Sequence, residues 1–594
     1  MTISADTGSQ AYPILKQSPL ESRATQPNML DYEQMRQSYS WDQAAKELKL
    51  PRSNGVNQAS ICIDGHPEAV MQKNALIWIG SKGNQETYTF NDLRHETNKF
   101  ANVLTGLGIQ KGDRVFVYLE RVPEIYITLF GGLKTGAVVG PLFSAFGPEA
   151  IRDRLEDSNA KIVITSPALK PRLDEIRQHL PGLQHVIVLD RENTGFKSGP
   201  NESKIHESLY SELMAKASEK FEVVQTDPDD ASIIHYTSGT TGKPKGAVHR
   251  HNALIAQYAT AKYILDLQAS DIYWCTADPG WVTGTSYGMF GPWSNGVTQL
   301  VYEGGFKAQD WYKVLQDHKV TVWYTAPTAI RMLMKAGEDV VKQFDLSSLR
   351  HLASVGEPLN PEAVVWGHKV FGHIFHDTWW QTETGAMQIC NYPCMDVKPG
   401  SMGKPFPGVE VGILDENGKP LPPGEEGHLA LRPTAPSFFK TYWNREEVYQ
   451  SRFKNDWYLT GDRAKQDEDG YYWFIGRDDD VINTAGHLVG PFEVESALIE
   501  HPAVAEAGVI GKPDPERMEI VKAFISLKEG FTESDELLQD IKQFVRKRLA
   551  AHAYPREIQV IAGLPKTRSG KIMRRLLKAR ELGLPEGDTS TLED

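Results

Sequence analysis

The chain has 594 residues, of which 40% are hydrophobic and 24% are charged. This composition is typical of soluble globular proteins and excludes collagen-like, disordered and disulfide-scaffold chains, while the length is enough for several domains. The 64 Lys and Arg residues against 77 Asp and Glu give a net charge of −13, which argues against nucleic acid or an anionic membrane as a partner.

The four cysteines are too few to cross-link a chain of this size. Cys390 and Cys394 form a C-x3-C pair with no second pair nearby, which is a weak zinc signal. The first residues, MTISADTGSQ, lack the basic and apolar regions of a targeting peptide, and we see no apolar stretch of about 18 residues. We therefore expect a soluble cytoplasmic protein with reduced thiols.

From Arg114 onward, short apolar segments alternate with amphipathic segments. We expect strands at 114–119, 138–143, 161–166 and 185–190, with helices at 123–135, 148–160 and 170–180. After Asp229 we expect further strands near 231–236, 298–303, 320–325 and 350–355. This alternation predicts an α/β fold whose parallel sheets are covered by helices on both faces.

The pattern changes after about residue 405. Residues 408–432 contain two strand-like segments separated by Asn-Gly and Pro-Gly turns, which is typical of a β-hairpin. The last section has expected helices at 491–500 and 534–551 and strands at 504–511 and 520–527. We expect a large N-terminal domain (1–478) that includes a β-rich subdomain (about 405–475), and a smaller, mobile α+β domain (479–594).

The strongest local signal is YTSGTTGKPKG at 236–246, which follows an expected strand. Glycines permit close approach of the backbone, so successive N–H groups can converge on an anion, and hydroxyl and ammonium groups add hydrogen bonds to phosphate oxygens. It is not a Walker loop, because Pro244 follows Lys243. A flexible linker is the alternative, but a linker would not need clustered lysines. The residues expected at the phosphates are Thr237, Ser238, Gly239, Thr240, Thr241, Gly242, Lys243 and Lys245.

This loop resembles the signature of the adenylate-forming superfamily, which comprises acyl-CoA synthetases, luciferases and peptide-synthetase adenylation domains. Five further blocks match in order: Gly356-Glu357-Pro358, TWWQTETG at 378–385, YLTGD at 458–462, GRDD at 476–479 and PKTRSGK at 565–571. These six ordered motifs are spread over residues 237–571, and the resemblance covers nearly the whole chain. It is greatest to the short-chain, acetyl-CoA-synthetase-like members.

The resemblance implies a reaction in two halves. A carboxylate attacks the α-phosphorus of ATP to give acyl-adenylate and pyrophosphate, and the CoA thiol then attacks the acyl carbon and releases AMP. By resemblance, Asp462 binds the ribose hydroxyls, Glu383 binds Mg²⁺ and Thr382 donates to the α-phosphate. The other nucleotide-binding positions implied are Gly356, Glu357, Pro358, Asp377, Thr378, Trp379, Gln381 and Arg477.

Lys571 matches the catalytic lysine of the superfamily. A fixed ammonium group beside the developing charge would stabilise the transition state. Because Arg574, Arg575 and Lys578 follow it, the alternative is an ordinary solvated helix face. The resemblance also suggests a lysine acyltransferase or deacylase as a partner, since acylation of Lys571 would remove its charge.

Five residues are expected, by resemblance, to line the acyl pocket: Trp281, Val282, Thr283, Val355 and Trp380. An indole at the end of the pocket would fill the volume that a longer chain needs, so acetate is the expected substrate, with propionate second. Ordinary core aromatics are the alternative, because the chain has 13 Trp residues.

By resemblance, Asp479 is a hinge, and Gly486 and His487 lie in the block around the CoA tunnel. Relatives commonly have an arginine where this chain has Leu488. Leucine cannot hold a phosphate, so that contact is either missing or supplied elsewhere, with His487 and Arg477 as candidates. We expect the C-terminal domain to rotate about Asp479 between the two half-reactions.

Two other functions remain open from the sequence. The first is an adenylating enzyme that transfers its acyl group to an acceptor other than CoA. The second is a non-enzymatic sensor of AMP or CoA, which Leu488 favours and which the retained Lys571, Asp462 and Glu383 disfavour.

Overall fold

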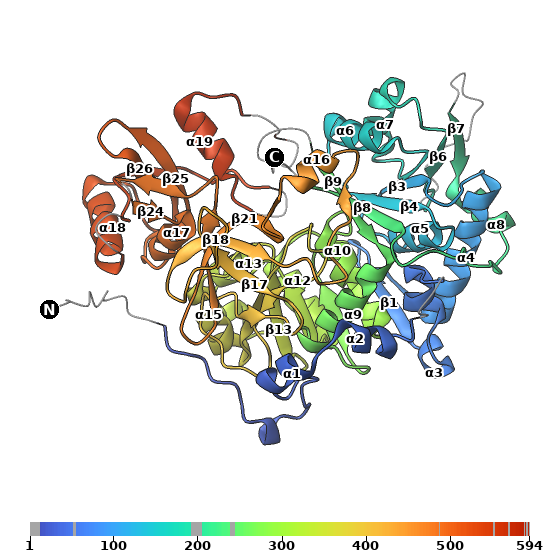
Figure 1. Cartoon of the computed structure of the whole chain (residues 1–594), viewed down its shortest axis with the longest axis horizontal. Coiled ribbons are helices and arrows are strands. Elements are labelled where there is room, and N and C mark those ends of the chain that lie inside the picture. Colours follow the sequence, from blue (N-terminus) through green and yellow to red (C-terminus); the bar gives the residue numbers. More distant parts are fainter. Residues whose placement is uncertain are drawn as a thin grey trace.

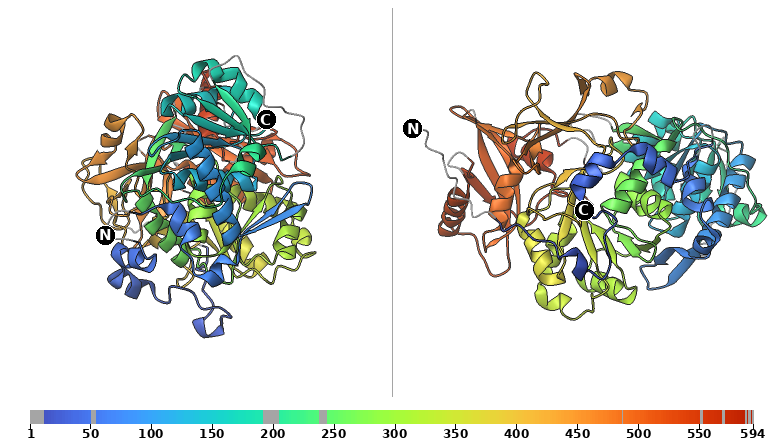
Figure 2. Two further views of the ribbon diagram at one scale, coloured as in Figure 1. Left: turned by 90° about the vertical axis from the view of Figure 1, so that its right-hand side faces the viewer. Right: turned by 60° about the horizontal axis from the view of Figure 1, so that its bottom comes forward.

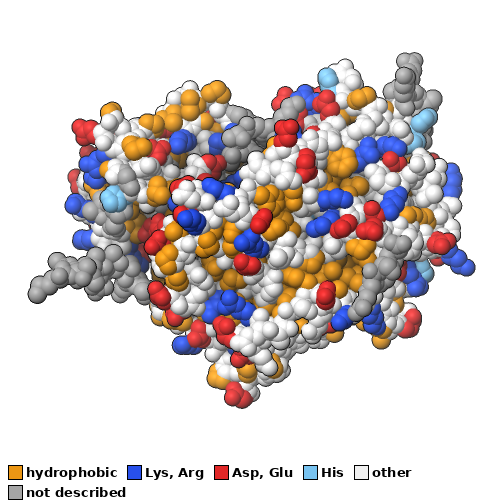
Figure 3. Space-filling model, in the orientation of Figure 1, with side chains coloured by type: hydrophobic (Ala, Val, Ile, Leu, Met, Phe, Trp, Pro, Cys, Tyr) orange, Lys and Arg blue, Asp and Glu red, His pale blue; other side chains and the backbone are white. Residues whose placement is uncertain are grey.

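The computed structural model describes residues 12–50, 55–191, 205–237, 244–485, 487–549, 553–567, 571–586, 589 and 592. Its strands form four sheets, and Figure 1 shows where they lie in the molecule. None of the helices within these ranges has the combination of length and apolar character that crossing a bilayer requires. On the face drawn in Figure 3, acidic and basic side chains are interspersed.

The largest sheet has nine strands in the order β16-β15-β14-β13-β12-β10-β11-β1-β2. Their bounds are β1 Asn74–Ile79, β2 Gln85–Thr89, β10 Ile272–Cys275, β11 Thr298–Tyr302, β12 Val322–Thr325, β13 His351–Val355, β14 Phe375–Trp379, β15 Ile389–Cys390 and β16 Lys404–Pro405. The strands from β14 to β1 are parallel, and β2, β15 and β16 are antiparallel edge strands.

A second sheet has eight strands in the order β19-β9-β8-β4-β3-β5-β6-β7. Their bounds are β3 Arg114–Tyr118, β4 Val138–Leu142, β5 Ile162–Thr165, β6 His185–Val188, β7 His206–Leu209, β8 Ala231–Thr237, β9 Lys245–Arg250 and β19 Thr441–Tyr442. Strands β8 to β7 are parallel, whereas β9 and β19 are antiparallel. The predicted parallel sheets are therefore confirmed. The antiparallel edge strands were not predicted. Three of them, β15, β16 and β19, have only two residues each and therefore carry no periodic signal.

The third sheet is antiparallel throughout, with β17 Val411–Leu414, β18 Glu426–Leu431, β20 Phe453–Lys454, β21 Trp457–Gln466 and β22 Tyr472–Arg477. The expected hairpin is confirmed, because β17 pairs with β18. The fourth sheet contains β23 Ile482–Thr484, β24 His487–Val489, β25 Val504–Asp514, β26 Met518–Leu527 and β27 Glu557–Val560. It lies at the opposite end of the molecule from the eight-stranded sheet (Figure 1; Figure 2).

Helices cover the sheets. Before residue 220 they are α1 Tyr32–Ser38, α2 Trp41–Glu47, α3 Glu68–Met71, α4 Phe90–Gly106, α5 Pro123–Lys134, α6 Pro148–Ser158, α7 Lys170–Ile176 and α8 Tyr210–Lys216. Those that follow are α9 Leu254–Tyr263, α10 Val282–Thr285, α11 Gly291–Ser294, α12 Ala308–Asp317, α13 Pro327–Ala336, α14 Glu338–Val341, α15 Pro361–Phe371, α16 Glu446–Gln450, α17 Pro491–Ile499, α18 Asp535–Arg548 and α19 Arg574–Leu582.

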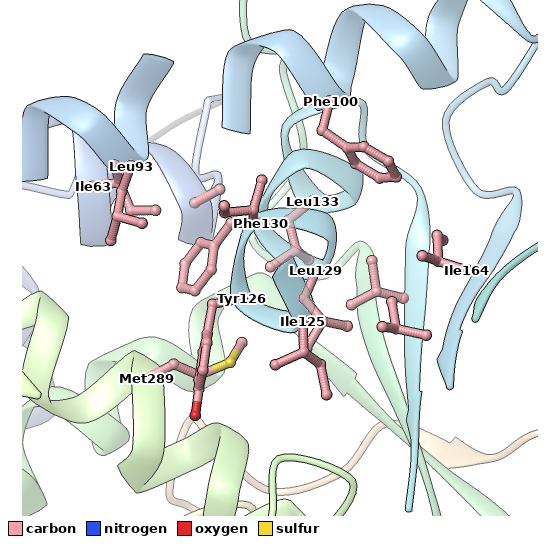
Figure 4. Packing of buried hydrophobic residues seen from close by; sticks show 14 of the residues in the cluster. Ile63, Leu93, Phe100, Ile125, Tyr126, Leu129, Phe130, Leu133, Ile164 and Met289 are labelled. Atoms are coloured by element: carbon pink, nitrogen blue, oxygen red, sulfur yellow. The ribbon is translucent and has the colours of Figure 1, made fainter. Parts of the chain in front are cut away.

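The largest hydrophobic cluster lies around α5, a helix that is buried on all sides. Its central residues include Tyr126, Phe130 and Met289, which lie side by side in Figure 4. Gly131 allows α4 to approach closely, because a Cβ at this position would lie 2.8 Å from the Phe100 ring. Helix α4 therefore packs directly against α5 in this cluster. The boundary expected near residue 479 stays a prediction.

Candidate functional site

The candidate site begins at the carboxyl ends of β13 and β14, which are neighbouring parallel strands. Ligands of α/β proteins commonly bind at this edge of a sheet. The segment Gly356-Glu357-Pro358 follows β13 directly, and the chain can turn there because Gly356 has φ +97°. Trp379 ends β14 and leads into the segment 380–385. Two of the sequence motifs are thus neighbours in space.

The carboxylate of Asp462 joins this edge to the antiparallel sheet. Its Oδ2 atom accepts hydrogen bonds from Trp379 Nε1 (3.0 Å) and Gln381 Nε2 (3.1 Å). Arg477, paired with it across β21 and β22, approaches Oδ1 to 3.5 Å. Burial raises the pKa of Asp462, while Arg477 and the Trp379 donor lower it. Residues from three of the predicted motifs therefore meet at one carboxylate.

Lys571 comes from the C-terminal section and lies in the same electrostatic environment. Two backbone contacts fix the position of Lys571 in the chain. Lys566 pairs with Ile572 as in a hairpin, and Lys571 N donates to Thr567 Oγ1 (3.0 Å). Part of Lys571 is open to solvent, yet the surrounding protein lowers its pKa. Arg477 and Arg574 lower the pKa further, and Glu357 and Asp462 raise it. The ammonium group therefore interacts electrostatically with Glu357 and Asp462, two of the predicted nucleotide residues.

Glu383 is fixed by a segment of the eight-stranded sheet. Its Oε1 atom accepts a hydrogen bond from the Tyr442 hydroxyl (2.7 Å), and its carbonyl accepts one from Phe439 N (2.8 Å). Lys245 lies 5.1 Å over the Tyr442 ring, and burial, followed by Arg452, lowers the pKa of this lysine. Tyr442 therefore contacts both Glu383 and Lys245, which is one of the residues expected at the phosphates.

The backbone of Thr382 is held by a buried histidine. His249 Nε2 lies 2.8 Å from the Thr382 carbonyl oxygen, and His249 Nδ1 lies 3.1 Å from that of Ser437. Of the phosphate loop itself, residues 238–243 lie outside the described residues. Its two ends are visible, and Thr237 Oγ1 lies 3.4 Å from the carbonyl oxygen of Lys245.

Asp377 and Thr378 lie beneath the site on β14. Asp377 is buried and accepts hydrogen bonds from Ser354 Oγ (2.5 Å) and Leu359 N (3.3 Å), which flank the 356–358 segment. Thr378 Oγ1 donates to the Ser354 carbonyl (2.7 Å). These side chains therefore hold the residues on either side of the expected nucleotide segment, 356–358. Their direct role with a nucleotide stays a prediction.

Two of the expected acyl-pocket residues belong to one hydrophobic cluster. Val355 is a member, and Trp380 packs against it, donating from Nε1 to the Tyr324 hydroxyl (3.3 Å) and meeting the Tyr287 ring edge-on at 5.2 Å. Trp281 instead packs on Phe143 in a different cluster, with ring centres 5.4 Å apart. Val282 and Thr283 begin α10, directly after Trp281.

The expected hinge residue, Asp479, lies close to Arg477. Asp479 Oδ1 is 3.8 Å from Arg477 Nε. Gly486 lies outside the described residues, whereas His487 and Leu488 are exposed on β24, the leucine at 41%. His487 and Arg477 were the two candidates for the phosphate contact that Leu488 cannot make. Of these, Arg477 lies at Asp462.

Three residues at the site had not been predicted: Tyr442, His249 and Arg452. Tyr442 and His249 act through contacts with residues that are distant in sequence, Glu383 and Thr382. Arg452 Nη2 donates to the Thr460 carbonyl (3.0 Å) beside Gly461. No local pattern marks them. In the described part of the chain, no three His, Cys, Asp or Glu side chains are grouped as a metal site.

Comparisons with known proteins match this arrangement. Residues 64–443 match the AMP-binding enzyme family, and residues 493–571 match the AMP-binding enzyme C-terminal domain. The acetyl-coenzyme A synthetase of Bacillus subtilis is 52% identical over 96% of this chain and 98% of its own length. That of Methanothrix thermoacetophila is 42% identical over 90% and 84%.

Two solved structures share the fold. A Brucella canis acyl-CoA synthetase is 37% identical, with a TM-score of 0.72, over 93% of this chain and 99% of that one. An anthranilate CoA ligase in complex with anthranoyl-AMP is 31% identical, with a TM-score of 0.80, over 90% of this chain and 98% of that one.

The buried Asp377 predicts a pH-dependent stability. Burial raises its pKa to about 7, although hydrogen bonds from Ser354 and Leu359 lower it. The unfolded chain therefore loses this proton near pH 4 and the folded chain near pH 7, so the free energy of unfolding falls by up to about 4 kcal/mol as the pH rises between those values. In Asp377→Asn this loss is absent. The melting temperature of the variant relative to the unsubstituted protein should therefore rise from pH 4.5 to pH 7.5.

Asp339→Asn is the matched control. Asp339 is an exposed carboxylate, and its ion pair with Lys342 lowers its pKa. Its melting temperature relative to the unsubstituted protein should stay constant over this pH range. A constant difference for Asp377→Asn as well would contradict the raised pKa.

Proposed function

The chain belongs to the adenylate-forming family of AMP-binding enzymes, and on this premise we propose that it is an AMP-forming acetate–CoA ligase. In the first half-reaction an acetate oxygen attacks the α-phosphorus of ATP, forming acetyl-adenylate and releasing pyrophosphate. In the second, the thiol of CoA attacks the acetyl carbon, the carbon–oxygen bond to AMP breaks, and acetyl-CoA and AMP leave.

One observation carries this proposal: residues from three motifs that are far apart in the chain meet at the carboxylate of Asp462, and the same carboxylate raises the pKa of Lys571 from the C-terminal section. Asp462 accepts from the ribose hydroxyls, and Lys571 stabilises the negative charge that develops as pyrophosphate leaves. Arg477, at 3.5 Å from Asp462, adds a second cation at this point. The phosphate loop 237–245 and Thr382 bind the phosphates.

The adenine is held by the segments at the ends of β13 and β14. Glu357 and its neighbours Gly356 and Pro358 lie on one side, and the backbone from Asp377 to Trp379 lies on the other. The indole of Trp379 has a further task, since its hydrogen bond to Asp462 orients the carboxylate toward the ribose.

Magnesium accompanies the nucleotide, and the residues present fit it. Mg²⁺ in phosphate sites is held by one or two carboxylates together with phosphate oxygens and water. Glu383 is a carboxylate of this kind, and the Tyr442 hydroxyl fixes its Oε1 atom at 2.7 Å. When bound, the ion neutralises charge on the phosphates. Glu383 would hold the ion, and the hydrogen bond from Tyr442 would keep Glu383 in place.

Trp380 limits the acyl chain. It packs with Val355 in one cluster and is braced by Tyr324 and Tyr287, so the ring cannot swing aside without losing these contacts. Acetate is therefore preferred over propionate, and longer acids are excluded. Trp281, Val282 and Thr283 line the remaining side.

The second half-reaction requires a different arrangement. We place the division of the chain at 1–478 and 479–594 and the hinge at Asp479, so that rotation withdraws Lys571 and brings Gly486 and His487 to the adenylate. Because Lys571 is exposed, a lysine acyltransferase can reach it, and acylation would stop the first half-reaction by removing the charge. A deacylase would restore the charge.

The proposal predicts acetate-dependent exchange of radiolabelled pyrophosphate into ATP, because adenylate formation is reversible. With ATP, Mg²⁺, CoA and a panel of C2–C8 carboxylates, AMP and thioester should form in equal amounts, with acetate the best substrate. Exchange without thioester would indicate an acceptor other than CoA. If no acid supported exchange, the sensor hypothesis would be favoured and the proposal would be wrong.

Lys571→Ala should separate the half-reactions. Loss of the ammonium group should slow pyrophosphate exchange by about 100- to 1,000-fold, the usual cost of removing a transition-state charge contact. Thioester formation from supplied acetyl-adenylate and CoA should be retained. Lys578→Ala is the control, because this lysine pairs with Glu519 in the same section of the chain. Equal loss of both half-reactions in a folded Lys571→Ala protein would contradict the role given to Lys571.

Trp380→Gly should shift the substrate preference towards longer acids. Each methylene accommodated in an apolar pocket changes discrimination by about tenfold or more, so the ratio of kcat/KM for hexanoate to that for acetate should rise at least about tenfold. The ratio is insensitive to the fraction of folded protein, and Trp380→Phe should give an intermediate value. An unchanged ratio would remove Trp380 from the pocket.

A further inference from the structure

A series of polar contacts leads from residues 356–358, here called the adenine segment, to the C-terminal section of the chain. Arg331 Nη2 is 2.9 Å from Glu357 Oε2, and Arg331 Nη1 donates to Asn360 Oδ1 at 3.3 Å. Asn360 Nδ2 then donates to Ser496 Oγ on α17 at 2.9 Å. Asn360 therefore joins the segment after β13 to a helix that follows the hinge.

Asn360 occupies an unusual position for these contacts. It is the N-cap residue of α15, and asparagine at an N-cap ordinarily accepts a hydrogen bond from the first turn of its own helix. Here the side chain makes no capping bond. Its amide is buried, with 4% of the residue exposed, so its polar atoms require partners. Those partners are Arg331 and Ser496. The side chain of Asn360 therefore links these two residues instead of capping its own helix.

Helix α17 is also bound to the segment that carries Lys571. Glu495, next to Ser496, accepts a hydrogen bond from Arg574 Nε at 2.7 Å, and Arg574 begins α19 just after Lys571. The same Glu495 Oε1 accepts from Val509 N (2.9 Å), which fixes the carboxylate to β25. Any displacement of α17 relative to the adenine segment would therefore displace Lys571.

We propose that Asn360 and Ser496 are positioning residues that dock α17 on the adenine segment and thereby place Lys571 over the nucleotide. The inference rests on the proposed function. The Asn360–Ser496 hydrogen bond spans the expected hinge, whereas the Arg331–Glu357 and Glu495–Arg574 pairs each lie on one side of it. Rotation about Asp479 breaks the first and leaves the other two intact, so this bond favours adenylation over thioester formation.

The size of the effect follows from the type of bond. A neutral hydrogen bond present in only one of two arrangements changes their ratio by about three- to tenfold. Ser496→Ala removes the acceptor and leaves every other contact described here in place. Asn360→Ala removes the donor, while Arg331 keeps its contacts with Glu357 and Thr328.

The test compares the two half-reactions in these variants of the full chain. Each should slow acetate-dependent pyrophosphate exchange about three- to tenfold at saturating ATP and acetate. Thioester formation from supplied acetyl-adenylate and CoA should be unchanged or faster. Because both substitutions remove the same bond, the double variant should be no slower than Asn360→Ala alone.

Ser534→Ala is the matched control. Ser534 caps α18 through Leu537 N (3.2 Å), so its loss should lower stability while leaving the ratio of the half-reactions unchanged. Equal slowing of both half-reactions by Asn360→Ala or Ser496→Ala, no effect on exchange, or additive effects in the double variant would overturn the docking role. Absence of exchange in the unsubstituted protein would instead overturn the proposed function and, with it, this inference.

Discussion

The hydrogen bonds from Trp379 and Gln381 to Asp462 are the interaction on which the site depends. Trp379 ends a strand of the nine-stranded sheet, and Asp462 belongs to the antiparallel sheet, so these bonds fix one sheet against the other. The contact between Tyr442 and Glu383 joins the same segment to the eight-stranded sheet. The residues 379–383 therefore lie where three sheets meet, and a small shift of any sheet would move them.

The charge around this junction differs from the charge of the whole chain. The protein carries a net charge of −13, yet Lys245, Arg477 and Lys571 each interact electrostatically with Glu383 or Asp462, two carboxylates of the candidate site. Burial lowers the pKa of both lysines, and neighbouring arginines lower it further. A polyphosphate brought among these cations would favour their charged forms. The local field therefore suits an anionic ligand even though the overall charge would repel one at long range.

Much of the fold could be predicted, because its signals are local. The proline at the start of α5 and the turn at Gly136, which has φ +73°, delimit a helix found at Pro123–Lys134 against an expected 123–135. The Asn-Gly turn likewise predicted the β17–β18 hairpin. Strand β19 could not be predicted, since its two residues, Thr441 and Tyr442, form a strand only by pairing with β9.

The site shows the same division. The motifs predicted that Asp462, Glu357 and Lys571 would converge, and both carboxylates raise the pKa of Lys571, while their roles with a nucleotide stay predictions. Tyr442, Asn360 and Ser496 escaped prediction, because their partners are distant in sequence and no periodicity links them. The exposed position of Leu488, too, is set by the pairing of β23 with β24 and not by its own residue type.

The two hydrogen bonds that fix Glu383 have an energetic consequence. Phe439 fixes its main chain and Tyr442 fixes its carboxylate, and both come from one short segment. Ordering a glutamate side chain costs about 1.5–2 kcal/mol of conformational entropy. Here that loss is incurred when the polypeptide folds, so a ligand arriving at the carboxylate meets a preorganised group and need not immobilise it.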